Sequence, residues 1–511
     1  MPKLMSLLLF LLLLTPLLSG CPEEAPEAEA EAPDFTSPLS LIAFSAEAST
    51  LRVKLTWEVP DEEDSPINKD LDGLIIVRAE GQYPEAIPMR GERYVAGDAL
   101  GFGVVIANLE PEAEGFSDEN IEAGDTYFYE AFTYDGVPNY SDAVKLNSTP
   151  GSLVQARLAH IQADLLDGRV LLCGGISSSG PLDTGEIFDP ETTAFRPLID
   201  DMISERFSHT ATVLNDGRVL LVGGYVSGLE NTLTTAEIFN PAAESFGRIE
   251  SEMDDGRAMH TATLLPDGQV LIVGGTDGVD ALNTMALFNP SELTFTTLES
   301  TLVRPRYGHR AALVGDIVYI LGGFDGFETL PYAAAIHLDF FEVTDLVGNP
   351  EQETQMLVGR LNPTLNELPD GAWLVAGGFT GTVSSGDQTD QCEIFMPEGP
   401  DFFKAAGSLD QARSGHAGVS LDNGMVLLTG GIGWDLAILS SAEIYDPETG
   451  AFSETGNMRL SRTVHGMSLL PDGRALVTGG NRSVDVFNPE PASTAEIYDP
   501  LTGVFTVVGA H

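Results

Sequence analysis

The feature that most constrains the fold of this chain is a glycine pair that follows a short apolar run and recurs seven times. The run reads GRVLLVGG from Gly217, and related copies include GRVLLCGG from Gly168 and GMVLLTGG from Gly424. Successive pairs are 48 to 55 residues apart. The pairs are Gly174-Gly175, Gly223-Gly224, Gly274-Gly275, Gly322-Gly323, Gly377-Gly378, Gly430-Gly431 and Gly479-Gly480. A period of about 50 residues is typical of propellers and repeat arrays, in which each copy buries its faces against its neighbours.

Each repeat divides into four predicted strands, the first of which follows an Arg-x-x-His motif. In six of the seven repeats a DG or NG pair separates the first two strands, which favours two-residue turns with positive φ. The second strand is apolar on both faces, as expected of a covered sheet, and its glycine pair permits a sharp turn. The fourth repeat, around residues 334–337, departs from the pattern of the others. Five residues after a proline, six repeats place a phenylalanine: Phe195, Phe246, Phe295, Phe402, Phe452 and Phe505.

These motifs resemble the kelch repeats of the galactose-oxidase-like propeller superfamily. The counterparts are the glycine pairs, Tyr445 and Tyr498 in the third strand, and phenylalanine where the family usually has a fourth-strand tryptophan. The resemblance covers residues 155–511 and implies an all-β fold with a seven-bladed kelch β-propeller over residues 152–511. Because the repeats begin with a first strand and end with a fourth, the sequence does not show how the first and last blades are joined.

Residues 36–148 precede the repeats and have a different pattern. Short apolar segments such as 50–59 and 126–135 alternate with turns, which predicts an N-terminal β-sandwich. The stretch resembles an Ig-like fibronectin type III domain: Trp57 stands at the place of the family's core tryptophan, and Tyr127 at that of its tyrosine corner. The resemblance implies a spacer or recognition module, and no residue in it indicates catalysis.

The first 35 residues indicate export and anchoring. Residues 1–20 contain Lys3 and a leucine-rich run, as in a signal peptide, and the LSGC at its end resembles the lipobox of bacterial lipoproteins. The resemblance implies that Cys21 is lipid-modified and attaches the chain to a membrane; an ordinary signal peptide or an anchor helix are the alternatives. Residues 21–35 predict an extended acidic tether. In diderm bacteria an aspartate directly after the lipidated cysteine favours retention at the inner membrane. Here that position is Pro22, which favours the outer membrane. The expected location is therefore the bacterial cell envelope, periplasmic or surface-exposed.

The net charge of −52 argues against nucleic acid or anionic lipid as a partner, because both require a basic surface. Such a charge fits a solvated extracytoplasmic surface, a saline habitat or divalent cation binding, with Ca²⁺ as the candidate ion; no other cofactor is expected. Cys173 and Cys392 fall in repeats that are not neighbours on a ring. We therefore expect two free, buried thiols rather than a disulfide.

Arginine and histidine recur in phase with the repeat, at the start of the first predicted strand. A functional interpretation makes them a ring of donors at one mouth of the axial channel, suited to an anionic ligand or a metal. An architectural interpretation has them bond a neighbouring blade or cap the start of a strand, because functional sites on propellers normally break symmetry. The fifth repeat has Pro363 in place of histidine. The candidate residues are Arg157, His160, Arg206, His209, Arg257, His260, Arg306, His309, Arg360, Arg413, His416, Arg462 and His465.

Three segments break the symmetry of the repeats and are further candidates for a ligand site: residues 340–356, 378–391 and 431–441. The last carries Trp434, one of three tryptophans in the chain. An exposed tryptophan often contacts carbohydrate or protein, although Trp434 could instead cover the edge of a blade.

These observations favour a lipid-anchored extracytoplasmic binding or scaffold protein that presents a kelch propeller to a protein or glycan, without catalysis. The alternatives are a carbohydrate-active enzyme, similar to kelch mutarotases or oxidases, and a purely structural envelope protein. No catalytic or metal-ligating set stands out: the cysteines lie inside repeat strands, and no adjacent Tyr-His pair exists for a copper oxidase. A recognition protein predicts asymmetric loops on one face, whereas an enzyme predicts clustered carboxylates or a metal in an axial pocket.

Overall fold

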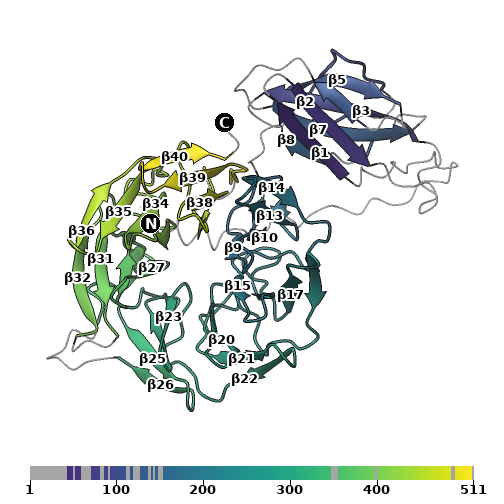
Figure 1. Cartoon of the computed structure of the whole chain (residues 1–511). Helices are drawn as coiled ribbons and strands as arrows, with labels where there is room; N and C mark the ends of the chain where they lie inside the picture. The colour runs from purple at the N-terminus through teal and green to yellow at the C-terminus, as the bar shows by residue number, and fades with distance from the viewer. Residues whose placement is uncertain are drawn as a thin grey trace. The chain divides into compact units, whose positions relative to one another are not determined.

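The computed structural model describes residues 43–49, 52–58, 71–80, 84, 86–89, 92–110, 115–118, 127–135, 140–141, 144–147, 153–346, 355–397, 401–484 and 489–508. The chain divides into two compact units, one within Leu18–Val154 and one that comprises Gln155–Val508 (Figure 1). The predicted signal peptide, Cys21 and the acidic tether lie outside the described residues. In the described part of the chain, no helix has the length and apolar character needed to span a membrane.

The first unit contains two antiparallel sheets. One has the strand order β1-β2-β6, formed by Ala43–Ser49, Arg52–Glu58 and Gly115–Asp118. The other has the order β4-β5-β3-β7-β8, formed by Ala99–Leu100, Gly103–Leu109, Leu71–Glu80, Tyr127–Asp135 and Val144–Asn147. Leu55 of the first sheet packs in one apolar cluster with Ile76 and Tyr129 of the second. The two sheets therefore share a core.

The five-stranded sheet of this unit is covered on both faces. On the side away from Leu55, Ile75 and Val77 pack against Tyr94 and Leu100, which come from the segment before β5. Such double burial explains why β3 reads as the continuous apolar run LIIV rather than as an alternating pattern. Tyr127, predicted to form a tyrosine corner, is the buried first residue of β7.

The second unit consists of repeated four-stranded antiparallel sheets, of which the described residues contain seven. Each sheet is formed by one sequence repeat, so the period of the glycine pairs is the period of the sheets. The first sheet has β9 Ile161–Asp164, β10 Val170–Cys173, β13 Gly185–Asp189 and β14 Ala194–Pro197. The second has β15 Thr210–Val213, β16 Val219–Val222, β17 Ala236–Asn240 and β18 Ser245–Arg248, and the third has β19 Thr261–Leu264, β20 Val270–Val273, β21 Met285–Asn289 and β22 Thr294–Thr297.

The remaining four sheets repeat this order, including the fourth, whose sequence departs from the pattern. The fourth has β23 Arg310–Val314, β24 Ile317–Leu321, β25 Ala333–His337 and β26 Glu342–Asp345, and the fifth has β27 Thr364–Glu367, β28 Trp373–Ala376, β31 Gln391–Phe395 and β32 Phe403–Ser408. The sixth has β33 Ala417–Ser420, β34 Val426–Thr429, β35 Ala442–Asp446 and β36 Ala451–Glu454, and the seventh has β37 Gly466–Leu469, β38 Ala475–Thr478, β39 Ala495–Asp499 and β40 Val504–Val507. Two short hairpins pair β11 Ile176–Ser177 with β12 Gly180–Pro181, and β29 Phe379–Gly381 with β30 Gly386–Gln388. The all-β class predicted from the sequence is confirmed.

The sheets lie around a common centre, and the first strand of each contacts the first strand of the next (Figure 1). The contact between β37 and β9 joins the last sheet to the first. No strand is exchanged between these two sheets among the described residues. Instead Gly480 N–H donates to Arg157 O at 2.9 Å, and Ala159 N–H donates to Val464 O at 3.2 Å. Backbone hydrogen bonds therefore make the joint that the sequence did not show.

The same backbone link joins every pair of neighbouring sheets in the described chain. The second glycine of each pair donates its N–H to the carbonyl of the arginine in the next repeat, at 2.8 to 2.9 Å. The glycines are required because no space exists for a side chain. A Cβ on Gly223 (φ +61°) would lie 2.3 Å from Arg257 O, and one on Gly224 (φ +97°) would lie 2.8 Å from Phe207 O. The prediction that the pair turns where a side chain would collide is confirmed.

Two details of the repeat differ from the sequence prediction. The DG glycines have positive φ as expected, but the hairpin has three loop residues: Leu165 N–H donates to Arg169 O at 2.8 Å. The two-residue turn occurs only in the fourth of the described sheets, where Val314 pairs with Ile317. In the fifth sheet Phe403, not Phe402, pairs with the third strand, because β32 begins one residue later.

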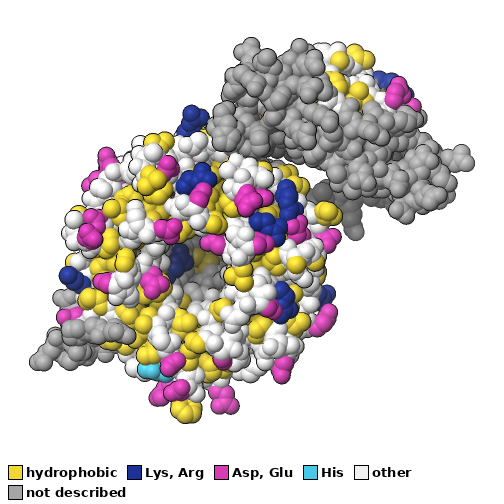
Figure 2. Space-filling view, in the orientation of Figure 1, with side chains coloured by type: hydrophobic (Ala, Val, Ile, Leu, Met, Phe, Trp, Pro, Cys, Tyr) yellow, Lys and Arg dark blue, Asp and Glu magenta, His cyan; other side chains and the backbone are white. Residues whose placement is uncertain are grey.

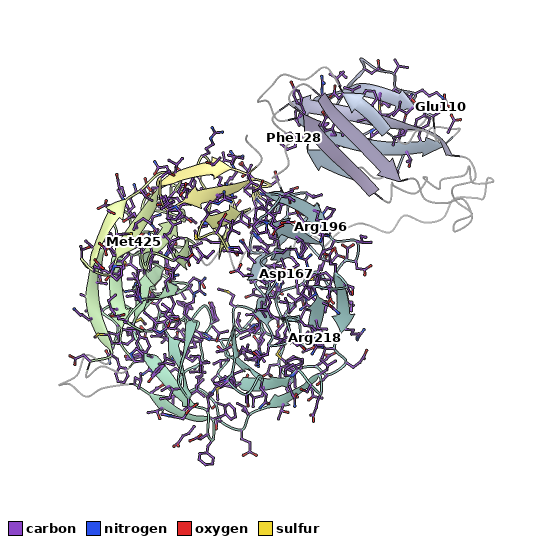
Figure 3. All side chains as sticks on the ribbon, in the orientation of Figure 1. Glu110, Phe128, Asp167, Arg196, Arg218 and Met425 are labelled. Atoms are coloured by element: carbon purple, nitrogen blue, oxygen red, sulfur yellow. The ribbon has the colours of Figure 1, made fainter. Side chains whose placement is uncertain are left out.

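Ion pairs also join neighbouring sheets on the outside. Arg169 contacts Asp167 at 2.6 Å and Glu244 of the second sheet at 2.5 Å, and Glu244 also pairs with Arg196. Figure 3 labels Asp167 and Arg196 on the same side of this unit. These side chains are partly exposed, so they contribute less to stability than the apolar clusters between the sheets.

Candidate functional site

The seven repeated arginines are buried inside their own sheets and do not line a cavity. Each is at most 2% exposed. Each donates from Nη1 to the carbonyl of the first glycine of its own pair, at 2.7 to 3.0 Å. Each also donates to a second carbonyl, which lies just before the third strand or, in the fifth sheet, on its first residue. The guanidinium groups thus hold the turn between the second and third strands. Backbone carbonyls and, in five sheets, a carboxylate occupy most of their donors, and one nitrogen of each guanidinium group is buried without a partner among the described residues.

In five of the described sheets a glutamate of the third strand completes this contact. The pairs are Arg157–Glu186, Arg206–Glu237, Arg360–Glu393, Arg413–Glu443 and Arg462–Glu496. Each glutamate also accepts a backbone N–H from the segment before its arginine. In the third and fourth sheets alanine stands at this position, as Ala286 and Ala334. Burial lowers the pKa of Arg257 and Arg306 to about 10 there, against nearby carboxylates that raise it.

The repeated histidines bridge neighbouring sheets. In five of the six, Nε2 lies within hydrogen-bonding distance of a threonine hydroxyl in the preceding sheet: His160–Thr478, His260–Thr210, His309–Thr261, His416–Thr364 and His465–Thr429, at 2.8 to 3.3 Å. Burial, assisted by nearby arginines, lowers the pKa of both His160 and His260 to about 3. The other four histidines have a pKa well below the usual value, again through burial. The ring of histidines is therefore neutral at ordinary pH.

His209 is the exception to the bridging pattern. Neither of its ring nitrogens has a hydrogen-bond partner among the described residues. The preceding sheet offers Ile161 and Cys173 at the positions where other sheets have threonine. His209 is therefore a buried polar group left free on the wall of the central cavity.

A cavity of about 360 Å³ lies at the centre of the second unit, at the end of the sheets that carries the glycine pairs. Figure 2 shows a hollow at the centre of this unit. Seven residues with left-handed backbone conformation, one from each repeat, form part of its wall: Ala159, Ser208, Met259, Gly308, Asn362, Gly415 and Val464, with φ of +49° to +63°. Hydrogen bonds such as Ser208 N–H to Ala159 O connect most of them head to tail. His160, His209, His260, His416 and His465 also line the cavity, whereas His309 does not.

Arg310 is the one basic side chain among the described residues that line the cavity besides the neutral histidines. It has no hydrogen bond or ion pair with any described residue, and burial lowers its pKa without any carboxylate to oppose the effect. The sequence prediction missed Arg310. The signal was present, because the corresponding residues of the other repeats are uncharged: Ile161, Thr210, Thr261, Thr364, Ala417 and Gly466.

Exposed apolar side chains occupy the loops after the glycine pairs in five successive sheets. The exposed fractions are 80% for Val279, 79% for Phe327, 46% for Val383, 62% for Trp434 and 44% for Val484. The loops of the fourth and fifth sheets contact each other, since Val383 N–H donates to Phe327 O at 3.1 Å. These residues, which we call the apolar loop tips, lie at the same end of the sheets as the cavity. Of the three asymmetric candidate segments, 378–391 and 431–441 thus contribute to this surface, and residues 347–354 of the third lie outside the described residues.

The two cysteines of the second unit, Cys173 and Cys392, are free and buried, as expected, and burial raises the pKa of both thiols to about 12. Within the described residues, no group of three or more His, Cys, Asp and Glu side chains is arranged to hold a metal ion. The cavity wall formed by described residues contains no aspartate or glutamate.

Comparison with known proteins identifies the repeat. A family model described as a kelch motif matches residues 412–459, which include Arg413, the sixth glycine pair and the strands β33 to β36. No curated protein matches the chain. A solved structure described as "Structure of YjhT" is similar, with a TM-score of 0.46 and 13% identity over 59% of this chain and 98% of that one. The motif match identifies a kelch repeat in the sixth sheet, and the repeated four-stranded antiparallel sheets of the second unit are consistent with the blades of a kelch β-propeller.

Proposed function

We propose that this chain is a lipid-anchored, non-catalytic binding protein of the bacterial cell envelope, attached through Cys21 to the outer membrane. In this proposal the seven described sheets are the blades of one seven-bladed propeller, and the first unit is a fibronectin-III-like sandwich that acts as a spacer. The backbone links that join the seventh sheet to the first support the closed ring. The core shared by the two sheets of the first unit supports the sandwich.

The observation that carries the binding function is the set of apolar loop tips. Five large apolar side chains in equivalent loops of successive sheets remain exposed, although these sheets bury most of the apolar residues of their second and third strands. Exposed apolar surface on a folded domain often marks an interaction site. In this proposal a protein or glycan ligand lies across the end of the propeller that carries the glycine pairs, beside the cavity.

The cavity itself favours binding over catalysis. General acid–base catalysis works best with a group whose pKa lies near the working pH. The carboxylates that a sugar-converting enzyme would use are absent from the described wall of the cavity, and burial holds the pKa of His160 and His260 at about 3. These histidines are therefore poor proton acceptors at neutral pH.

A binding screen tests this proposal. The purified full chain is applied to a glycan array and to a panel of envelope peptides, and hits are measured by calorimetry. We expect saturable binding without turnover, at least tenfold weaker in Trp434→Ala and in Phe327→Ala. Leu501→Ala is the matched control, because Leu501 is 95% exposed in the turn before β40, at the opposite end of the sheets. Chemical conversion of a bound sugar would overturn the proposal in favour of an enzyme.

The anchor is tested separately by metabolic labelling with a radioactive fatty acid. We expect the wild-type chain to incorporate the label and to sediment with the outer membrane, and Cys21→Ala to do neither. Equal sedimentation of both chains would contradict lipid anchoring and leave the binding function untouched.

A further inference from the structure

We propose that Arg310 binds the carboxylate of a small acidic ligand, or of an acidic group on a larger one, inside the central cavity. This inference rests on the proposed binding function and adds the chemical class of the ligand. It depends on three observations, which concern the free guanidinium, its neutral surroundings and the size of the cavity.

The free guanidinium is unusual in this chain. The sequence contains 77 acidic residues, yet none of the described carboxylates pairs with Arg310. The seven repeated arginines, by contrast, have their donors satisfied or largely satisfied within their own sheets. Arg310 is partly buried, and a partly buried cation without a protein partner is typical of a site that acquires its partner from outside. The architecture of the fourth sheet does not need this arginine, because the six corresponding positions carry uncharged residues.

The described wall of the cavity contains neutral polar side chains and, besides Arg310, no charged group. Ser414 Oγ and both ring nitrogens of His209 are buried on the cavity wall without a hydrogen-bond partner among the described residues. Asn362 and Ser208 also line the cavity. A guanidinium binds a carboxylate through two parallel N–H donors, and hydroxyl and amide groups can bind the remaining polar atoms of the ligand.

The charge and size of the cavity favour a single carboxylate over a phosphate dianion. One guanidinium balances one negative charge, and a second charge would remain uncompensated among apolar neighbours such as Leu158, Phe207 and Ile432. A volume of about 360 Å³ lies at the low end of the range for small-molecule sites. The cavity therefore fits a small acid or the acidic end group of a larger ligand.

The experiment uses pairs of probes in which an uncharged group replaces the carboxylate. The purified full chain is titrated with N-acetylglycinate and its neutral twin N-acetylglycinamide, and with glucuronate and its neutral twin glucose, at constant ionic strength. The first pair represents a peptide carboxyl end and the second an acidic sugar. Inorganic phosphate is the third probe. We expect at least one acid to bind tenfold or more tightly than its neutral twin and than phosphate.

Arg310→Met is expected to abolish the preference for the acid. Arg248→Met is the matched control, because it removes an equal charge from an exposed side chain. Without ligand, Arg310→Met should unfold at a temperature equal to or above that of the wild type, since it removes a partly buried cation that has no partner among the described residues. A structural role would instead lower the unfolding temperature.

The outcomes separate this inference from the proposed function. If acid and neutral twin bind equally, or if Arg310→Met binds acids as well as the wild type, the inference is wrong and a binding cavity remains. If none of the acids binds, but a ligand from the binding screen binds more weakly to Trp434→Ala, then this inference is wrong and the proposed function stands. Tighter binding of phosphate than of either acid, or a lower unfolding temperature of Arg310→Met, also overturns it.

Discussion

The seven described sheets fall into two groups, which hold the turn between the second and third strands with different residues. In the five, a buried arginine pairs with a glutamate of the third strand; in the third and fourth sheets, alanine replaces that glutamate. The strands keep the same register in both groups, and Arg306 still donates to Gly322 O and Tyr332 O at 2.9 and 3.0 Å. The contact that all sheets share is therefore between the guanidinium and the backbone of the glycine turn. The glutamate is an addition to it, and the fourth sheet, which lacks it, is also the one that carries Arg310.

The largest expected effect distinguishes the two groups directly. Arg413→Met leaves Glu443 buried without its cation, and breaking a buried pair in this way costs about 3–5 kcal/mol. Arg306→Met leaves only backbone carbonyls without a donor, so we expect a cost of about 1–2 kcal/mol. The free energy of unfolding of each variant, from urea denaturation followed by fluorescence, is the measurement. Equal losses in the two variants would contradict the distinction.

A double variant sharpens this comparison by giving the sixth sheet the composition of the fourth. Arg413→Met combined with Glu443→Ala removes both charges, so no buried ion remains unpaired. We expect the double variant to regain about 2 kcal/mol of the stability that Arg413→Met loses, and to unfold close to Arg306→Met. If the double variant is less stable than the single one, the glutamate has a role besides pairing, through the backbone N–H groups of Asp410 and Gln411.

Acid should protonate the buried histidines, which six of the seven repeats contain. The expected loss of stability for each histidine is smaller than the loss caused by Arg413→Met. The histidines are neutral when folded, because their folded pKa lies far below the unfolded value of about 6.5. The unfolded chain therefore gains protons first as the pH falls. The stability they provide is complete above about pH 6.5 and is lost as the pH falls below that value, by about 1.4 kcal/mol per pH unit for each histidine.

The measurement is the free energy of unfolding between pH 7 and pH 4.5 for the wild type and for His465→Gln. Glutamine retains a polar group near Thr429 but does not titrate in this range. We expect a shallower pH dependence in the variant by about one proton. An unchanged slope would mean that His465 is protonated in the folded protein, contrary to its buried position.

The period of the glycine pairs predicted most of the second unit, because that period records a backbone contact. Each pair is required by the carbonyl of the next repeat's arginine, so it recurs wherever one sheet joins another. The joint between the last sheet and the first was not predictable, since it uses the same link and leaves no separate signal in the sequence. The position of Phe403 was missed because a one-residue shift at the start of β32 changes which phenylalanine faces the third strand.

The candidate site was less predictable than the fold for a physical reason. Repeated residues such as Arg157 and His160 dominate the pattern, and they are repeated because every sheet needs them for its own packing. Arg310 occurs once and adjoins a repeated histidine, so a search for periodic residues passes over it. The position is recognised only by comparing the residue after the histidine in all repeats. Trp434 was found by the opposite criterion, since it lies outside any repeated position.

The smallest expected effect comes from the partly exposed ion pairs on the outside, which contrast with the buried pairs of the five sheets. Arg196→Ala removes one of two arginines at Glu244, and Arg169 remains bonded to that carboxylate. An exposed pair of this kind is worth about 0–1 kcal/mol, and we expect a loss of less than about 0.5 kcal/mol. The loss should disappear in about 1 M NaCl, because ions then screen charges beyond about 3 Å. Arg413→Met should keep its full cost in the same salt, since water and ions do not reach Glu443. A salt-independent loss in Arg196→Ala would show instead that its aliphatic stem packs against the sheet.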